Sequence, residues 1–359
     1  MRILYLMHVD WNWIKQRPHF IAEELAKNGN KVDIIFKKQY VKNNLVDNGT
    51  FNGSIRPIPS LRGGDRFKII QIFNRLIYLL FLRTIKTQKY DYVFVSHPLL
   101  FSDCIKSKII YDCMDDYAAF SKSLESDYHR NTLLNFELKL SKKAELVVFS
   151  SDYLRCAVRN RYGNIFKNSV VVNNAINMPT NSIVFSEKKV TDTINLTYIG
   201  TISNWFDFEV LKKVKETYKS KKIIVNMYGP CETKKIEIED FNFLGPINHD
   251  KIFNVMMDSD ILIMPFVLTE LIKSVNPVKL YEYIYSGKPI ITLKYGETEK
   301  FSDYVYLYEP GNAESFIEQL NLIASNNYKG KVSIETAIEY VKHNTWECRI
   351  SEIQKYMEE

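Results

Sequence analysis

The sequence is poor in residues that cross-link a chain or hold a structural metal ion. Its 359 residues include five cysteines, and no two of them form a C-x-x-C pair. They are Cys104, Cys113, Cys156, Cys231 and Cys348. Such scattered cysteines exclude a disulfide framework and a zinc ribbon, and they predict a protein of the reducing cytoplasm.

Long uncharged apolar runs are also lacking, so the sequence predicts no membrane-spanning helix. The nearest approach is residues 67–85, where Lys68, Arg75 and Arg83 interrupt the apolar residues. Two interpretations of this segment remain open: a buried domain helix, or a helix that lies on anionic lipid as a peripheral contact with the inner membrane. Residues 1–6 pass directly into a predicted strand without a small-residue cleavage site, so we expect no signal peptide.

Positively charged residues are only in small excess over negatively charged ones. The 48 Lys and Arg residues against 42 Asp and Glu residues leave a net charge of +6. This charge suits anionic ligands or acidic lipid, but it is too small to indicate nucleic acid, and no nucleic-acid-binding signature accompanies it. With 46% apolar residues the chain can bury a large core, and 359 residues are typical of two domains.

Short apolar strands alternate with amphipathic helices along most of the chain. The predicted strands are residues 3–9, 31–36, 92–95, 108–111, 145–149, 169–172, 195–199, 223–228, 260–265 and 290–293. A polar segment at 178–193 divides them into two sets. This alternation predicts an α/β fold with two Rossmann-like, doubly wound parallel sheets and a linker at the polar segment.

The most clearly marked helix begins near Asn276 and ends near Gly287. Asn276 is a good N-cap, Pro277 suits the first helical position, and Gly287 suits the left-handed residue after a helix. The start of such a helix attracts phosphate through its backbone N–H groups. Lys279 and Glu282 share one helix face, so we expect a nucleotide site with Lys279 on the diphosphate and Glu282 on the ribose. The alternative is an ordinary capped helix with a surface ion pair.

The run Pro-Val-Lys-Leu-Tyr-Glu-Tyr that begins at Pro277, with Gly-Lys-Pro after it, resembles the donor-binding motif of bacterial GT-B glycosyltransferases of surface-polysaccharide biosynthesis, the glycosyltransferase group 1/4-like enzymes. Residues 198–207, 242–247 and the Gln-Arg-Pro-His run at 16–19 resemble the same group. The resemblance implies two Rossmann-like domains that face a cleft. These would be an acceptor-binding domain over 1–180, a donor-binding domain over 181–335, and a C-terminal helix over 336–359 that packs back on the N-terminal domain.

The resemblance also implies a set of donor contacts in the C-terminal domain. These residues are Gly200, Thr201, Ser274, Asn276, Val278, Lys279 and Glu282. For the loop at Gly200, an ordinary turn between a strand and a helix is the alternative. Retaining members of the group carry the pattern E-x7-E, and this chain has Ser274 at the first position and Glu282 at the second. The missing first glutamate leaves retention and inversion of the transferred sugar both open.

In the N-terminal domain we expect site residues beyond the carboxyl ends of strands, where open parallel sheets bind ligands. Asp115 and Asp116 follow one strand, and we assign Asp115 as the base that would deprotonate an acceptor hydroxyl, with Asp116 second. His97 follows another strand as a rival base or phosphate contact. Arg17 and His19 lie at a helix start and would meet acceptor or donor phosphates. The alternatives are acids and polar groups that cap helices or join domains.

These features predict a cytoplasmic, metal-independent glycosyltransferase. It would move a sugar from a nucleotide diphosphate sugar, with UDP-sugars favoured, to a saccharide or polyprenyl-linked acceptor. We expect no metal ion and no cofactor, because a helix start and Lys279 can neutralise the leaving diphosphate. Two alternatives of the same fold remain, a sugar-nucleotide epimerase and a non-catalytic nucleotide-sugar-binding subunit.

Overall fold

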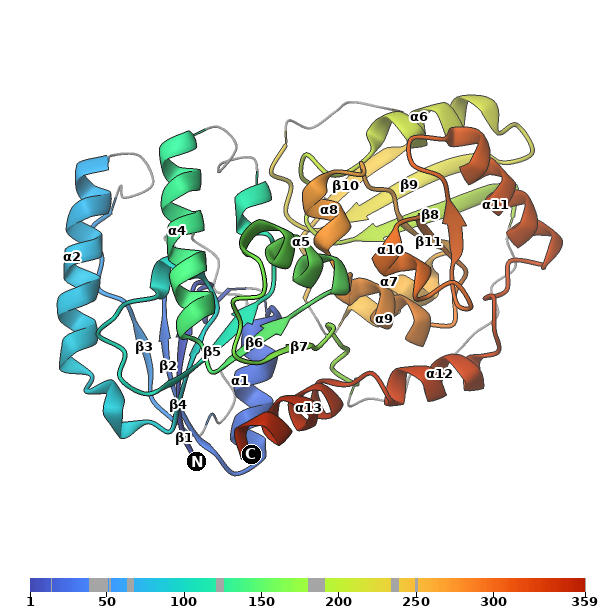
Figure 1. Ribbon diagram of the computed structural model, residues 1–359. Coiled ribbons are helices and arrows are strands. Elements are labelled where there is room, and N and C mark those ends of the chain that lie inside the picture. Colours follow the sequence, from blue (N-terminus) through green and yellow to red (C-terminus); the bar gives the residue numbers. More distant parts are fainter. Residues whose placement is uncertain are drawn as a thin grey trace. The chain divides into compact units, whose positions relative to one another are not determined.

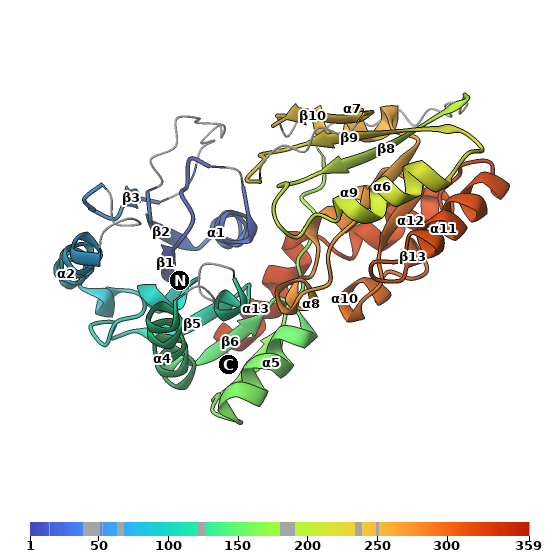
Figure 2. The same cartoon turned by 90° about the horizontal axis from the view of Figure 1, so that it is seen from above.

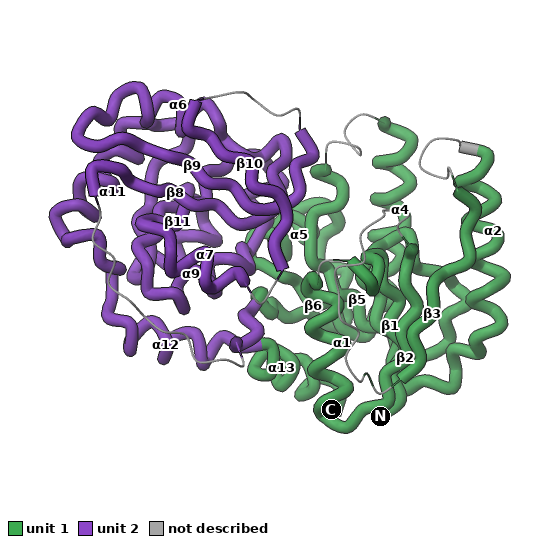
Figure 3. Tube along the Cα trace, turned by 180° about the vertical axis from the view of Figure 1, so that it is seen from behind, with its two compact units in different colours: residues 1–174, 346–359 green, residues 175–345 purple. Residues whose placement is uncertain are grey.

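The computed structural model describes residues 1–13, 15–38, 51, 53–62, 68–120, 126–179, 191–233, 239–248 and 251–358. The chain forms two compact units (Figures 1 and 3): unit 1 comprises residues 1–174 and 346–359, and unit 2 comprises residues 175–345. The linker expected at 178–193 and the domain boundary expected between residues 180 and 181 lie largely outside the described residues.

Unit 1 is built on a parallel sheet of seven strands in the order β3-β2-β1-β4-β5-β6-β7. They are β1 (Arg2–Met7), β2 (Lys31–Phe36), β3 (Ile55–Pro57), β4 (Tyr92–Val95), β5 (Lys108–Cys113), β6 (Leu146–Phe149) and β7 (Ser169–Val171). All four residues of β4 are buried, because helices cover both faces of the sheet. The strand order reverses at β1, which pairs with β2 on one side and β4 on the other. Ligands of doubly wound sheets bind at such a switch point.

Helices cover both faces of this sheet (Figures 1 and 2). They are α1 (Arg17–Lys27), α2 (Lys68–Thr84), α4 (Asp127–Lys143), α5 (Asp152–Tyr162) and α13 (Trp346–Glu358), with the 3-10 helices η1 (Thr87–Lys89), η2 (Pro98–Leu100) and η3 (Tyr117–Ala119). Tyr78 of α2, Leu140 of α4 and Leu154 of α5 share one apolar core with the strands. On α1, Phe20 stacks against Trp346 of α13 with 5.3 Å between ring centroids.

Unit 2 repeats this plan with a six-stranded sheet in the order β10-β9-β8-β11-β12-β13. Its strands are β8 (Thr193–Ile199), β9 (Lys222–Tyr228), β10 (Phe241–Gly245), β11 (Ile261–Met264), β12 (Ile290–Leu293) and β13 (Tyr306–Tyr308). Its helices are α6 (Phe208–Thr217), α7 (Ile252–Asp258), α8 (Glu270–Ser274), α9 (Val278–Tyr285), α10 (Gly296–Glu299), α11 (Ala313–Ser325) and α12 (Ile334–Lys342). The order reverses at β8, which pairs with β9 and β11. Two doubly wound parallel sheets confirm the predicted fold class.

The C-terminal segment expected as one helix over 336–359 instead contains parts of two helices, one in each unit. α12 packs on α9 in unit 2, whereas α13 belongs to unit 1. The Asn344 side chain donates to the carbonyl of Tyr340 at 2.8 Å, so a polar side chain takes up one of the carbonyls left over at the end of α12. Near the end of α13, the Tyr92 hydroxyl donates to the Met357 carbonyl at 2.8 Å and fastens this helix to β4. Within the described ranges, no helix is both long enough and apolar enough to cross a bilayer.

Candidate active site

A cluster of ring side chains lies at the switch point of unit 1. His8 follows β1 and His97 follows β4, and the His97 ring lies 4.2 Å from the Tyr117 ring and 5.3 Å from the His8 ring. The Tyr117 hydroxyl donates to the Ser96 carbonyl at 2.8 Å, and His97 Nδ1 accepts the N–H of Leu99 at 3.1 Å. Burial lowers the pKa of His8 to about 3 and the pKa of His97 well below its usual value. Both rings are therefore neutral at neutral pH and are poor bases.

Asp115 lies just beyond β5. The side chain is half-buried, and no hydrogen bond or ion pair to its carboxylate occurs in the part of the chain that the structure describes. Burial, with a further contribution from the charge of Asp112, raises the pKa of Asp115 to about 7. A general base works best with a pKa near the working pH. Asp115 therefore has the chemistry of a base, which His8 and His97 lack.

Asp116, by contrast, is bound by the protein. Its carboxylate pairs with Arg161 at 2.7 Å and accepts the N–H of Ala118 at 3.2 Å, which caps η3. Arg161 also pairs with the buried Glu137 at 2.7 Å. These contacts favour the alternative in which Asp116 caps a helix and holds the loop. We therefore assign no base role to Asp116.

Arg17 and His19 at the start of α1 point into unit 1. Arg17 is 2% exposed, and it donates to Asp112 at 2.8 Å and to the Val172 carbonyl at 2.8 Å. His19 caps α1 through Nδ1, and its Nε2 lies 3.2 Å from the Asp10 carbonyl oxygen. Burial lowers the pKa of His19 to about 4, so this ring is neutral at neutral pH. The contacts favour a structural role for both residues over the expected phosphate contact.

In unit 2, Lys279 and Glu282 lie together on the first turns of α9. The Lys279 ammonium is 2.6 Å from Glu282 Oε2, and the two side chains are 28% and 6% exposed. Tyr283 of the same helix accepts the N–H of Ile199 at 2.8 Å, which ties α9 to the carboxyl end of β8. A cation, a carboxylate and a helix start are therefore held together beside the switch point of this unit.

The expected N-cap role of Asn276 is wrong. Pro277 is the N-cap of α9, one residue later than expected, and its side chain makes no capping hydrogen bond. The Asn276 amide instead donates to Glu297 at 3.2 Å and accepts from the Tyr281 hydroxyl at 3.2 Å. Asn276 is thus held in a buried polar network just before the start of α9. Gly287, as expected, has left-handed backbone (φ 68°), and a Cβ there would also meet Ile334.

Gly200 and Thr201 follow β8 in a loop that touches the loop after β9. The Gly200 N–H donates to the Tyr228 carbonyl at 2.8 Å, and the Thr201 carbonyl accepts from the Tyr198 hydroxyl at 2.9 Å. A Cβ at Gly229, which has φ 145°, would lie 2.0 Å from the Gly200 carbonyl oxygen. Glycine at position 229 therefore permits the close approach of these two loops.

Two further expected donor residues differ in their surroundings. Val278 is the first residue of α9 and is half-buried. Ser274 ends α8, is fully buried, and its hydroxyl donates to the Leu271 carbonyl at 2.7 Å. The residue at the first position of the E-x7-E pattern is thus packed into the interior of unit 2.

Comparison with known proteins agrees with this arrangement. The family described as Glycosyl transferases group 1 matches residues 194–326, which include β8 except for its first residue, α9, and the loops after β8 and β9. The chain is a glycosyltransferase, and its segment 194–326 matches group 1. This glycosyltransferase is 26% identical over 291 residues to TuaH of Bacillus subtilis (strain 168), which is assigned to teichuronic acid biosynthesis as a glycosyltransferase. The match covers 74% of this chain and 70% of TuaH. The epimerase and the non-catalytic subunit are not favoured.

Solved structures share the whole fold of the glycosyltransferase. Sucrose-phosphate synthase from Thermosynechococcus elongatus matches with a TM-score of 0.71 and 14% identity, over 99% of this chain and 98% of that one. Anabaena Alr3699/HepE in complex with UDP and glucose matches with a TM-score of 0.70 and 12% identity, over 100% and 99%. At such identities the likeness concerns the fold, and that fold is GT-B.

Sequence reasoning missed three residues of these sites in the glycosyltransferase: His8, Tyr117 and Gly229. His8 directly follows β1, but the strand expected over residues 3–9 included it, so the rule that selected His97 and Asp115, position beyond the carboxyl end of a strand, did not single it out. Gly229 directly follows β9 and could have been found by this rule. The sequence gives no comparable signal for Tyr117, whose contacts with His8 and His97 exist only in the folded sheet.

Proposed function

We propose that the glycosyltransferase moves a sugar from a UDP-sugar to a saccharide or polyprenyl-linked acceptor in bacterial surface-polysaccharide synthesis, in the cytoplasm at the inner face of the cell membrane. The observation that carries the proposal is the Lys279–Glu282 pair at the start of α9, inside the span that matches group 1. Two named proteins support the finer parts: HepE was solved with UDP and glucose, and TuaH is assigned to teichuronic acid biosynthesis.

The donor part of the proposal uses the chemistry of unit 2. The start of α9 and the Lys279 ammonium would stabilise the diphosphate as negative charge develops on it, and Glu282 would accept hydrogen bonds from the ribose hydroxyls. The backbone at Gly200 and Thr201, together with Asn276, Val278 and Ser274, would shape the rest of this site. Among the described residues, no group of three His, Cys, Asp or Glu side chains is placed to hold a metal ion.

The acceptor part of the proposal uses unit 1. A hydroxyl oxygen of the acceptor forms a bond to the anomeric carbon, the bond from that carbon to the diphosphate oxygen breaks, and the nucleoside diphosphate leaves. The hydroxyl proton passes to the Asp115 carboxylate. The neutral rings of His8 and His97 would line the acceptor side without competing for this proton.

A panel of nucleotides tests the donor class. We expect UDP to raise the melting temperature of the protein more than GDP, TDP or CMP does, with and without magnesium. At about 100 times its dissociation constant, a ligand stabilises the fold by roughly 2.7 kcal/mol, which thermal shift detects readily. A selective shift with GDP or TDP would correct the nucleotide, and no shift with any nucleotide would remove α9 as a donor site.

The pKa of Asp115 predicts the pH dependence of transfer. A general base must be ionised, and with a pKa of about 7 the ionised fraction of Asp115 falls about tenfold for each pH unit well below 7. We therefore expect kcat/KM to rise with pH and to level off above about pH 7. The measurement is initial rates from about pH 5 to pH 9 with a purified acceptor. A rate that does not change over this range would contradict a base role for Asp115.

A further inference from the structure

One face of α2 is apolar and exposed. Its large side chains Ile69, Ile72, Phe73, Leu76 and Leu80 are 68%, 61%, 53%, 51% and 62% exposed. Their spacing of three and four residues places them in one stripe along the helix, which lies at the outer side of unit 1 in Figure 2. Single exposed apolar residues are ordinary, but a continuous apolar stripe marks a surface that meets a partner. We call these five residues the α2 stripe.

The opposite face fixes α2 to unit 1. Tyr78 is buried and its hydroxyl donates to the Leu100 carbonyl at 2.5 Å. The Arg75 guanidinium donates to the Leu99 carbonyl at 2.5 Å and to the Phe101 carbonyl at 2.7 Å. The helix therefore already has its intramolecular partner on one face, and the α2 stripe remains exposed in the folded unit. Two interpretations of residues 67–85 were open. A buried domain helix explains the inner face of α2, but it does not explain the exposed apolar side chains of the α2 stripe.

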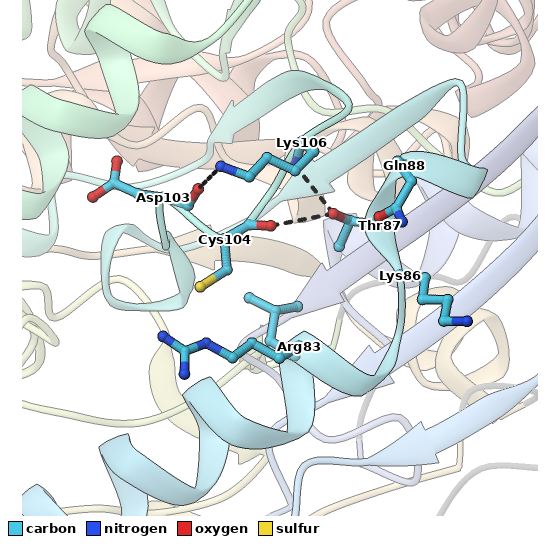
Figure 4. A pocket seen from close by; sticks show the side chains of 8 residues that line it. Arg83, Lys86, Thr87, Gln88, Asp103, Cys104 and Lys106 are labelled. Atoms are coloured by element: carbon cyan, nitrogen blue, oxygen red, sulfur yellow. Dashed lines mark hydrogen bonds between the residues drawn. The ribbon is translucent and has the colours of Figure 1, made fainter.

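Positive charge predominates around α2. The sequence has six Lys and Arg residues and no Asp or Glu from Arg66 to Tyr90. A surface hollow of about 400 Å³ opens beside the C-terminal end of the helix, and Arg83, Lys86 and Lys106 line it with Asp103 (Figure 4). The Lys106 ammonium donates to the Asp103 carbonyl at 3.1 Å. Three cations against one carboxylate give the hollow a positive balance that suits a phosphate group.

Lys86 adds a separate observation. Its backbone is left-handed, with φ 50°, a conformation that glycine adopts at lower cost than a lysine. The exposed lysine side chain at this strained position is part of the lining of the hollow, and in Figure 4 it extends away from Arg83 and Cys104. Replacing Lys86 by glycine therefore removes the charge and relieves the backbone at the same time, which makes the position useful for a test.

We propose that the α2 stripe and the cationic hollow together form a docking surface for an anionic lipid bilayer. The stripe enters the boundary between headgroups and acyl chains, and Arg83, Lys86 and Lys106 contact lipid phosphates. Charge complementarity selects this occupant, because a second copy of the chain would present the same cations to this face. The surface would give the proposed function its membrane location, and all of its residues belong to unit 1.

Vesicle flotation of the full-length protein tests the docking surface. We expect binding to vesicles of phosphatidylcholine with about one-third phosphatidylglycerol, weaker binding to phosphatidylcholine alone, and release at high salt. The variant Phe73→Ser/Leu76→Ser should lower the partition coefficient at least about tenfold. Lys86→Gly should lower it about fivefold, the equivalent of one basic residue near an anionic surface, without lowering the melting temperature.

Matched controls lie in unit 2. Leu322 is 53% exposed on α11 and Lys212 is exposed on α6, so Leu322→Ser and Lys212→Gln should leave flotation unchanged. The proposal is overturned if the protein floats with neither vesicle, or if these controls weaken flotation as much as the α2 variants do. It is also overturned if sedimentation shows a dimer that Phe73→Ser/Leu76→Ser dissociates. The flotation assay contains no donor and no acceptor. A negative flotation result therefore leaves the proposed donor site standing, and a negative nucleotide result leaves the docking surface standing.

Discussion

Replacing Asp115 by asparagine is expected to lower the rate of sugar transfer at least about 100-fold while leaving donor affinity nearly unchanged. The side chain keeps its size but can no longer accept the acceptor proton. Because Asp115 belongs to unit 1 and the donor residues to unit 2, the loss should fall on kcat and spare the dissociation constant of UDP. Initial rates with acceptor and calorimetric titration of UDP measure the two quantities. Full activity of the variant would remove Asp115 as the base.

Stability supplies the control for this variant. The carboxyl pKa rises from 3.8 to about 7 on folding, so between these values the folded state keeps a proton that the unfolded state has lost. The stabilisation from this proton is complete below about pH 4 and is lost as the pH rises through about 7. Asparagine does not titrate, so at about pH 8 Asp115→Asn should be at least as stable as the parent protein. If the melting temperature of the variant were well below that of the parent protein, unfolding would explain the lost activity.

The neighbouring acid offers a matched comparison. Asp116→Asn breaks the ion pair with Arg161 at 2.7 Å and weakens the cap of η3, so it should lower the melting temperature. At a temperature where the variant stays folded, transfer should continue at close to the parent rate. The two substitutions thus distinguish Asp115, which would accept the proton, from Asp116, which holds the loop after β5 in place.

The sequence correctly predicted the strands that are covered on both faces of their sheets. The strands expected at 92–95 and 290–293 are β4 and β12, whose residues are all buried and therefore form apolar runs. It missed β3 and β13, which have three residues each and lie at the ends of their sheets, too short for any apolar pattern to repeat. It also missed α11, although the N-cap Asn312 and the buried spacing of Phe316, Leu320 and Ile323 were available.

Within the candidate site, the sequence could select a region but not a role. Asp115 and Asp116 are adjacent and chemically identical, and the difference between them comes from Arg161, a residue distant in sequence that α5 brings to Asp116. In the same way, Asp112 and the Val172 carbonyl bind Arg17, although nothing near Arg17 in sequence indicates this. Helix signals gave the position of Lys279 and Glu282 well, because that pair depends only on the helix repeat.

Replacing Glu282 by glutamine is expected to weaken UDP binding about 10- to 100-fold, the loss that follows when a charged acceptor of hydrogen bonds is removed. The matched control is Glu270→Gln, which breaks a Lys–Glu pair of the same spacing between Glu270 and Lys273 at 2.7 Å, on α8 instead of α9. That variant should bind UDP as the parent does, because its carboxylate is exposed and is not assigned to the donor.

A ligand change then identifies which part of the donor Glu282 meets. If its carboxylate binds the ribose, the parent protein should bind 2′,3′-dideoxy-UDP about 10- to 100-fold more weakly than UDP, and Glu282→Gln should bind the two nucleotides almost equally. If Glu282 only holds Lys279 in place, the variant should lose the same factor for both nucleotides, because both carry the diphosphate that Lys279 would meet. Equal losses would therefore reject the ribose contact and keep α9 as a phosphate site, whereas unchanged affinity for both would reject the donor site as a whole.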